Sequence, residues 1–178
     1  MDSFKFNIHR ISIIGTTGSG KTTLACELGI LLNIPVYSLD TLQKDGTGHK
    51  IEIKDFVAKV EKVSSADSWI VDGGYKITNP IVLQPAQAVI WLDYPLRILL
   101  PRQIKRNLHQ NPVISSVSPK KIANRFGNFI SLVRKLVRKH RQQKKAYNTL
   151  PVDYPHGHVF HFTHPTQKQI WLESLHQE

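Results

Sequence analysis

A glycine-rich stretch near the amino end has the residue types and spacing of a phosphate-binding loop. It matches the pattern G-x-x-x-x-G-K-[ST] and consists of Gly15, Thr16, Thr17, Gly18, Ser19, Gly20, Lys21 and Thr22, with Thr23 directly after them. In such a loop the backbone N–H groups turn inward, the lysine reaches the β- and γ-phosphates, and the final hydroxyl ligates Mg²⁺. The sequence therefore predicts a binding site for ATP and Mg²⁺.

The segments on either side of this loop are those that the motif requires. Residues 11–14 form a short β-branched run that is suited to a buried strand, and apolar residues recur at helical spacing between Leu24 and Leu32. A helix that begins near Lys21 adds the positive end of its dipole to the phosphate site. Strand, loop and helix thus stand in the order that confirms the motif.

The charge of the chain is concentrated in one segment. The 178 residues carry a formal net charge of +11, yet residues 94–152 contain fourteen Lys/Arg and no Asp or Glu, including seven of the eight arginines. A solvated helix face normally mixes both signs, so this segment predicts an anionic partner: phosphate groups, a nucleic acid, or both.

Length and composition favour one cytoplasmic α/β domain. No apolar run approaches the roughly 18 residues of a membrane span, and the first residues lack the pattern of a signal peptide. No membrane partner is expected, and a monomer or homodimer is expected. Cys26 is the only cysteine, and we expect it to be a small packing residue of the first helix.

Three of the expected strands end in an acidic residue. Residues 36–39 precede Asp40, residues 69–71 precede Asp72, and residues 88–92 precede Asp93; residues 159–162 form the last strand. Ligands bind outside the carboxyl ends of parallel strands. Asp40 is therefore placed to bind a phosphoryl acceptor or to accept a proton from its hydroxyl, with a simple turn cap as the alternative.

The segments between the strands predict helices on both faces of a parallel sheet. We expect a loop at 43–50, a helix around 56–63 that caps the acceptor site, a helix from Pro95 to about Leu108, a loop at 111–119, a long basic helix through 122–137 and a final helix around 170–175.

This order of motifs resembles the adenylate kinase-like P-loop kinases, and most closely the FlaR-like proteins labelled "DNA topology modulation". The matching segments are the loop from 13 to 23, Ile34 and Pro35 with Leu39 and Asp40, residues 69–75, and residues 89–95. The resemblance implies a P-loop NTPase fold of three α/β/α layers with a five-stranded parallel sheet, like that of nucleoside monophosphate kinases. It implies one domain over 1–178, with an acceptor-side segment at about 41–68 and a basic lid segment at about 103–141.

The same resemblance implies roles for residues outside the loop. Asp72 would hold the water shell of Mg²⁺, with Asp93 as the alternative, and Lys76 stands where an arginine usually binds the acceptor phosphate. Because Lys lacks the planar fork of Arg, this exchange weakens the case for a nucleotide acceptor.

Basic residues after the fourth strand keep the spacing of lid arginines. Arg102 and Arg106 are one helical turn apart, so both can contact β- and γ-phosphates. The resemblance adds Arg134, Arg138 and Arg141 as further transition-state charges, and places His164 and Pro165 against the adenine.

Two hypotheses follow. The first is a kinase that transfers the γ-phosphoryl group of ATP to a small-molecule acceptor, a nucleoside, nucleotide or hydroxylated metabolite, with catalysis by Lys21, Asp40, Arg102, Arg106 and Arg138. The alternative is an ATP-regulated protein that binds nucleic acid and affects DNA topology.

Overall fold

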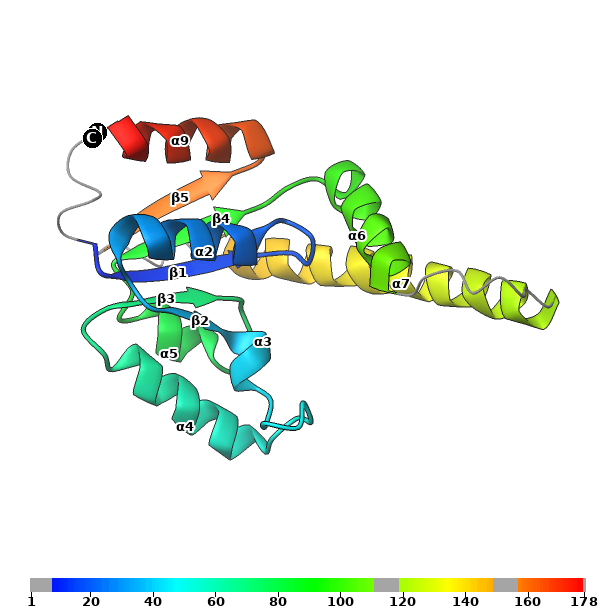
Figure 1. Cartoon of the computed structure of the whole chain (residues 1–178), viewed down its shortest axis with the longest axis horizontal. Helices are drawn as coiled ribbons and strands as arrows, with labels where there is room; N and C mark the ends of the chain where they lie inside the picture. The colour runs from blue at the N-terminus through cyan, green and yellow to red at the C-terminus, as the bar shows by residue number, and fades with distance from the viewer. Residues whose placement is uncertain (1–7, 111–118, 149–156, 178) are drawn as a thin grey trace.

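A single sheet of five parallel strands forms the centre of the molecule (Figure 1). The computed structural model describes residues 8–110, 119–148 and 157–177; most of the predicted loop at 111–119 lies outside them. The strands are β1 (Arg10–Gly15), β2 (Val36–Ser38), β3 (Trp69–Asp72), β4 (Ala88–Leu92) and β5 (His158–Phe162), in the order β2-β3-β1-β4-β5. All four neighbouring pairs are parallel, as predicted.

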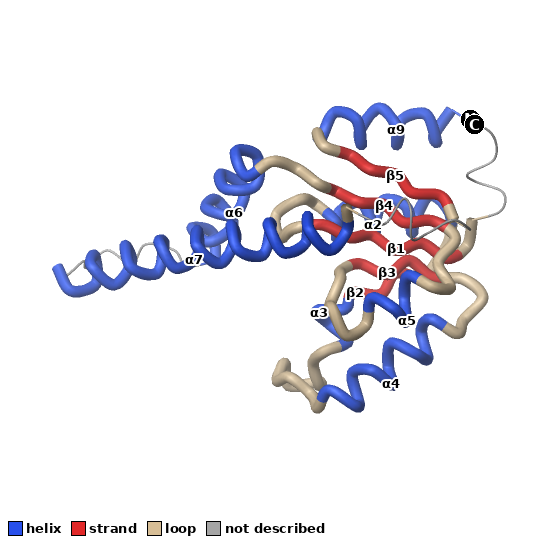
Figure 2. The backbone as a smooth tube through the Cα atoms, turned by 180° about the vertical axis from the view of Figure 1, so that it is seen from behind, coloured by secondary structure: helices blue, strands red, loops and turns tan. Residues whose placement is uncertain are grey.

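The central strands are buried on both faces because helices cover both sides of the sheet. Side chains that alternate along β1, β3 and β4 point to opposite faces, as in any strand. On one face Ile11, Ile13 and Ile90 pack against α2 (Lys21–Leu32) and α9 (Pro165–Gln177). On the other face, seen from behind in Figure 2, the sheet packs against α4 (Ile53–Ser64) and α5 (Asn79–Leu83). The predicted three-layer α/β/α architecture is confirmed.

The helices differ from the expectation in two places. Strand β2 ends at Ser38, and the short helix α3 (Leu39–Leu42) begins at once, so Asp40 lies in a first helical turn instead of at a strand end. Helix α5 was not among the expected helices; it is only five residues long and has Pro80 in its first turn. Cys26 is exposed on α2, so the expectation that it is a small packing residue was wrong.

Two basic helices follow β4. Helix α6 (Leu96–Gln110) leads to α7 (Pro119–Tyr147), whose first half extends beyond the sheet in Figure 1. The other end of α7 packs on the α4 side of the sheet, where Tyr147 is only 3 % exposed. Among the described residues, no helix combines the length and the hydropathy that crossing a bilayer would require.

Candidate active site

The glycine-rich loop connects β1 to α2 at the carboxyl edge of the sheet. Gly15, Gly18 and Gly20 have φ angles of 146°, 87° and 92°, which side-chain-bearing residues rarely adopt. A Cβ atom on Gly15 would also lie 2.5 Å from the carbonyl oxygen of Leu92. The glycines therefore allow the loop to turn tightly against β4, with the amino end of α2 opening on the turn.

Lys21 is the first residue of α2 and points back over the loop. Its Nζ donates to the carbonyl oxygen of Thr16 at 3.3 Å. Burial lowers the pKa of Lys21, as do the charges of Lys139 and Arg106, whereas the carboxylates of Asp72 and Asp40 oppose the shift. The ammonium group of Lys21 therefore lies near both cationic and anionic side chains.

Thr22 and Asp72 form a second pair in this site. The hydroxyl of Thr22 donates to Oδ2 of Asp72 at 2.5 Å. Asp72 is 5 % exposed, and its Oδ1 is buried with no hydrogen-bond partner among the described residues. Burial raises the pKa of Asp72, while the Thr22 hydrogen bond and the Lys21 charge act in the opposite direction. A hydroxyl beside an unpaired carboxylate oxygen fits Mg²⁺ and its water shell, since this ion prefers oxygen ligands.

Asp93, the alternative acid, faces a different part of the molecule. Its Oδ2 lies 3.5 Å from Nζ of Lys144 on α7 and 3.3 Å from Nε2 of His161 on β5. The His161 ring stacks on Trp91 with centroids 4.0 Å apart. Asp93 is thus an attachment point for α7, and it does not line the cavity beside the loop.

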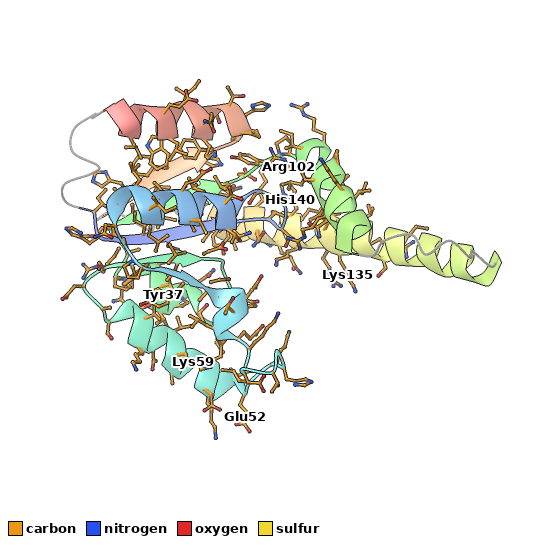
Figure 3. The ribbon with its side chains drawn as sticks, viewed as in Figure 1. Tyr37, Glu52, Lys59, Arg102, Lys135 and His140 are labelled. Atoms are coloured by element: carbon orange, nitrogen blue, oxygen red, sulfur yellow. The ribbon has the colours of Figure 1, made fainter. Side chains whose placement is uncertain are left out.

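A cavity of about 300 Å³ opens above the loop, and basic side chains enter it from α6 and α7. Arg102 and Arg106 line it from α6. Arg102 also lies over the ring of Tyr94, 5.8 Å from its centroid, and burial raises the pKa of Tyr94 to about 12. Figure 3 shows Arg102 and His140 converging on the loop from these two helices.

Helix α7 presents a different set of residues to the cavity than the sequence suggested. Arg134, Arg138 and Arg141 are exposed and do not line the cavity, whereas Lys139 and Gln143 do. The Nζ of Lys139 donates to the Thr17 hydroxyl at 3.5 Å, and Nδ1 of His140 lies 3.3 Å from the Thr16 hydroxyl.

Sequence reasoning missed Lys139, Gln143 and the α6 residue Gln103, all of which line the cavity. Helical register is the sequence signal that could have predicted Lys139 and Gln143. Leu136 and Tyr147 are the buried residues of the carboxyl half of α7, and Lys139 and Gln143 fall between them at spacings of three and four.

Asp40 also lines the cavity, together with the loop that follows β3. The hydroxyl of Tyr75 donates to Oδ1 of Asp40 at 2.5 Å. Burial and the Asp40 carboxylate both raise the pKa of Tyr75, so its hydroxyl stays protonated. Lys76 is exposed and does not line the cavity.

A second hollow of about 620 Å³ adjoins the glycine-rich loop on the side of α9. Gly18, Gly20 and Arg102 line both cavities, and Pro165 and Thr166 close this one. His164 does not line it; its Nδ1 lies 3.0 Å from the hydroxyl of Thr166. Of the predicted adenine-side pair, the structure therefore brings only Pro165 to the hollow.

Solved structures with a similar architecture include kinases that share little sequence with the chain. Shikimate kinase from Acinetobacter baumannii in complex with shikimate is 19% identical, with a TM-score of 0.58 over 96% of this chain and 92% of that chain. Shikimate kinase from Bacteroides thetaiotaomicron is 14% identical, with a TM-score of 0.58 over 96% and 97% of the two chains. The fold is that of the P-loop kinases.

An uncharacterized protein from Eubacterium ventriosum has the same fold, at 15% identity and a TM-score of 0.53 over 96% of this chain and 99% of that chain. Comparisons with protein-family models and with curated proteins found no match. The similarity therefore establishes the fold, and the finer resemblance to FlaR-like proteins stays a prediction.

Proposed function

We propose that this protein is a kinase that transfers the γ-phosphoryl group of ATP to a small-molecule acceptor. The observation that carries the proposal is the convergence of Lys21, the Thr22–Asp72 pair, Arg102 and Arg106 on one cavity at the carboxyl edge of the sheet. Phosphoryl transfer needs little covalent chemistry from the protein, since alignment and charge neutralisation supply most of the catalysis. This cavity offers both.

Each residue has a role that follows from its position. The loop amides and Lys21 would hold the β- and γ-phosphates, and Arg102 and Arg106 would neutralise the charge that develops on the transferred group. Thr22 and Asp72 would hold Mg²⁺, which would supply positive charge to neutralise the phosphates. Lys139 takes the place that we predicted for Arg138, because it reaches the cavity from the same helix.

The nucleobase would lie in the hollow that Pro165 and Thr166 close. The acceptor would lie on the side of Asp40, between the acceptor-side segment at 41–68 and the lid segment at 103–141. The whole chain then acts as one kinase domain. The similarity of fold to shikimate kinases supports this assignment, although the low identity leaves the acceptor open.

Two assays on the full chain test the proposal. Calorimetry measures the binding of Mg-ATP, and a second assay measures ADP release in the presence of candidate acceptors. Lys21→Ala should abolish both binding and turnover, because it removes the ammonium group nearest the phosphates. Lys135→Ala is the matched control: it removes the same charge from an exposed position on α7 outside the cavity (Figure 3). Equal behaviour of the two variants would refute the proposal.

A second function, ATP-regulated binding of nucleic acid, rests on one observation. Arg134, Arg138 and Arg141 are exposed on α7 and lie outside the phosphate cavity. If such residues bind a duplex, the logarithm of the affinity should fall linearly with the logarithm of salt concentration. Titration of labelled duplex DNA at 50 to 200 mM salt tests this function. Tight binding at about 150 mM salt favours it, and weak binding favours the kinase function alone.

A further inference from the structure

The charges that line the phosphate cavity are already matched to one nucleotide. Among the described residues, four cationic side chains line it, from Lys21, Arg102, Arg106 and Lys139, and two carboxylates, from Asp40 and Asp72. Their formal sum is a net charge of +2. The magnesium complex of a nucleoside triphosphate carries about two negative charges at neutral pH. A second anion in the same cavity would be left without a counter-charge, which is costly away from bulk water.

The acceptor side of the chain offers no cation for such an anion. No arginine occurs between Arg10 and Arg97, a stretch that includes the whole acceptor-side segment. The lysines of this stretch after α2 are absent from the described residues that line the cavity; they are Lys44, Lys50, Lys54, Lys59, Lys62 and Lys76.

Two of these lysines have partners elsewhere on the surface. Lys54 pairs with Glu52 at 3.3 Å, and Lys59 donates to the carbonyl oxygen of Lys44 at 3.4 Å. Figure 3 shows Glu52 and Lys59 along α4, away from the loop between β1 and α2. An acceptor phosphate or carboxylate would therefore meet the carboxylate of Asp40 without a compensating cation from this side.

The groups that do face the acceptor suit a hydroxyl. Tyr75 packs edge-on against Phe56, with ring centroids 5.5 Å apart, and Phe56 is 1 % exposed. This contact fixes the phenol, whose hydroxyl donates to Oδ1 of Asp40. Asp40 lines the cavity, and its second carboxylate oxygen, Oδ2, is a further acceptor that another hydroxyl can use. The charged group that shifts the pKa of Tyr75 is Asp40, and the Asp40 carboxylate also acts on Lys21 in the same cavity.

We propose that the phosphoryl acceptor is an uncharged hydroxylated compound, such as a polyol, an unphosphorylated sugar or a nucleoside, and that Asp40 and Tyr75 recognise its reacting hydroxyl. This inference rests on the proposed kinase function. The acceptor oxygen forms a bond to the γ-phosphorus, the bond from that phosphorus to the β,γ-bridging oxygen breaks, and ADP leaves with the electron pair. The hydroxyl proton passes to Oδ2 of Asp40.

A matched panel of acceptors tests the inference with the full chain and Mg-ATP. One set contains uncharged polyols, sugars and nucleosides; the other contains hydroxy acids, sugar phosphates and nucleoside monophosphates with the same carbon skeletons. We expect at least one uncharged compound to raise ADP release at least about tenfold above the rate with water alone, and its anionic counterpart to be much weaker. Turnover with anionic acceptors only, or with none of the compounds, overturns the inference.

Binding of Mg-ATP, measured together with the acceptor panel, distinguishes failure of the acceptor inference from failure of the kinase function. If the wild type binds Mg-ATP and phosphorylates only anionic acceptors, the kinase function stands and the inference falls. If it does not bind Mg-ATP, both fall.

Tyr75→Phe tests the recognition pair directly, because it keeps the ring against Phe56 and removes only the hydroxyl. Loss of one hydrogen bond to a charged group should raise the KM for the uncharged acceptor by roughly tenfold or more, while the KM for ATP stays unchanged. Asp40→Asn should lower kcat by about 10²- to 10⁴-fold with Mg-ATP affinity retained. An unchanged acceptor KM in Tyr75→Phe overturns the role of Tyr75.

Discussion

The carboxyl end of α7 is anchored to the sheet by Tyr147, and this anchor depends on a glycine. The hydroxyl of Tyr147 accepts a hydrogen bond from Nδ2 of Asn79 at 3.1 Å, and its ring packs edge-on against Trp91 with centroids 6.1 Å apart. A Cβ atom added to Gly74 would lie under 3.0 Å from that hydroxyl, closer than real Cβ atoms approach. Gly74→Ala should therefore push Tyr147 out of its place.

The expected loss of stability has two opposing parts. Overpacking of a well-filled site costs about 1–3 kcal/mol. Gly74 does not have a positive φ angle, so Ala fits its backbone and restricts the unfolded chain, which stabilises by about 0.4–1 kcal/mol. The net destabilisation is then about 1–2 kcal/mol. Tyr147→Phe alone loses one hydrogen bond, about 1 kcal/mol, and removes the atom that clashes.

Equilibrium urea denaturation of the single and double variants measures these terms. The double variant Gly74→Ala, Tyr147→Phe should be less destabilised than the sum of the two single variants by about 1 kcal/mol or more, because the clash and the hydrogen bond share one oxygen. Gly46→Ala is the control, since nothing lies within 4 Å of a Cβ there and its φ is not positive. Strict additivity, or a Gly74→Ala variant as stable as Gly46→Ala, would refute the anchor.

Three further predictions concern the cavity. Arg102→Ala should lower kcat by about 10²- to 10³-fold, whereas Arg138→Ala should leave kcat within about twofold of the wild type. Equal losses of kcat in steady-state assays would contradict the placement of Arg102 inside the cavity and Arg138 outside it. Asp72→Asn should abolish the Mg²⁺ dependence of nucleotide binding, as measured by calorimetry. Asp93→Asn should retain this Mg²⁺ dependence and lower the free energy of unfolding by about 1–3 kcal/mol, as measured by denaturation. Burial lowers the pKa of Lys21, so the cost of burying its charged form is full below that lowered pKa and fades as the pH rises from there to the ordinary value of 10.5. Lys21→Met without nucleotide should therefore melt above the wild type at pH 7, and the gap in melting temperature should narrow toward pH 10.5.

The sequence was sufficient for the central sheet and the loop because both depend on local signals. Gly15, Gly18 and Gly20 mark backbone conformations that few other residues adopt, and the β-branched strands sit between turn residues. The same local signals failed at Asp40. A strand of three residues that passes directly into a helix has no glycine or proline to mark the boundary, so the helical turn was read as part of the strand.

The acids at the carboxyl ends of β3 and β4 could not be told apart before the fold was known. Each ends an apolar strand, and local sequence treats Asp72 and Asp93 alike. Strand order separates them, because β3 and β4 lie on opposite sides of β1. Asp72 thus comes beside Thr22 at the start of α2, while Asp93 faces β5 and meets His161 and Lys144.

Helix α7 shows why a charge pattern can predict a basic helix but not which of its residues reach the cavity. The charged residues of this helix are all basic, so the sequence favoured arginines by type. Attachment at Tyr147 and at the Asp93–Lys144 pair fixes the rotation of the helix. Lys139 lies about two turns before Tyr147 on the attached side, and Arg138 is turned from it by about 100°. For Arg138 to enter the cavity, α7 would have to rotate by that angle and give up both attachments. The anchor therefore selects the lysine, and loosening it should weaken Mg-ATP binding even where no phosphate-contacting residue has changed.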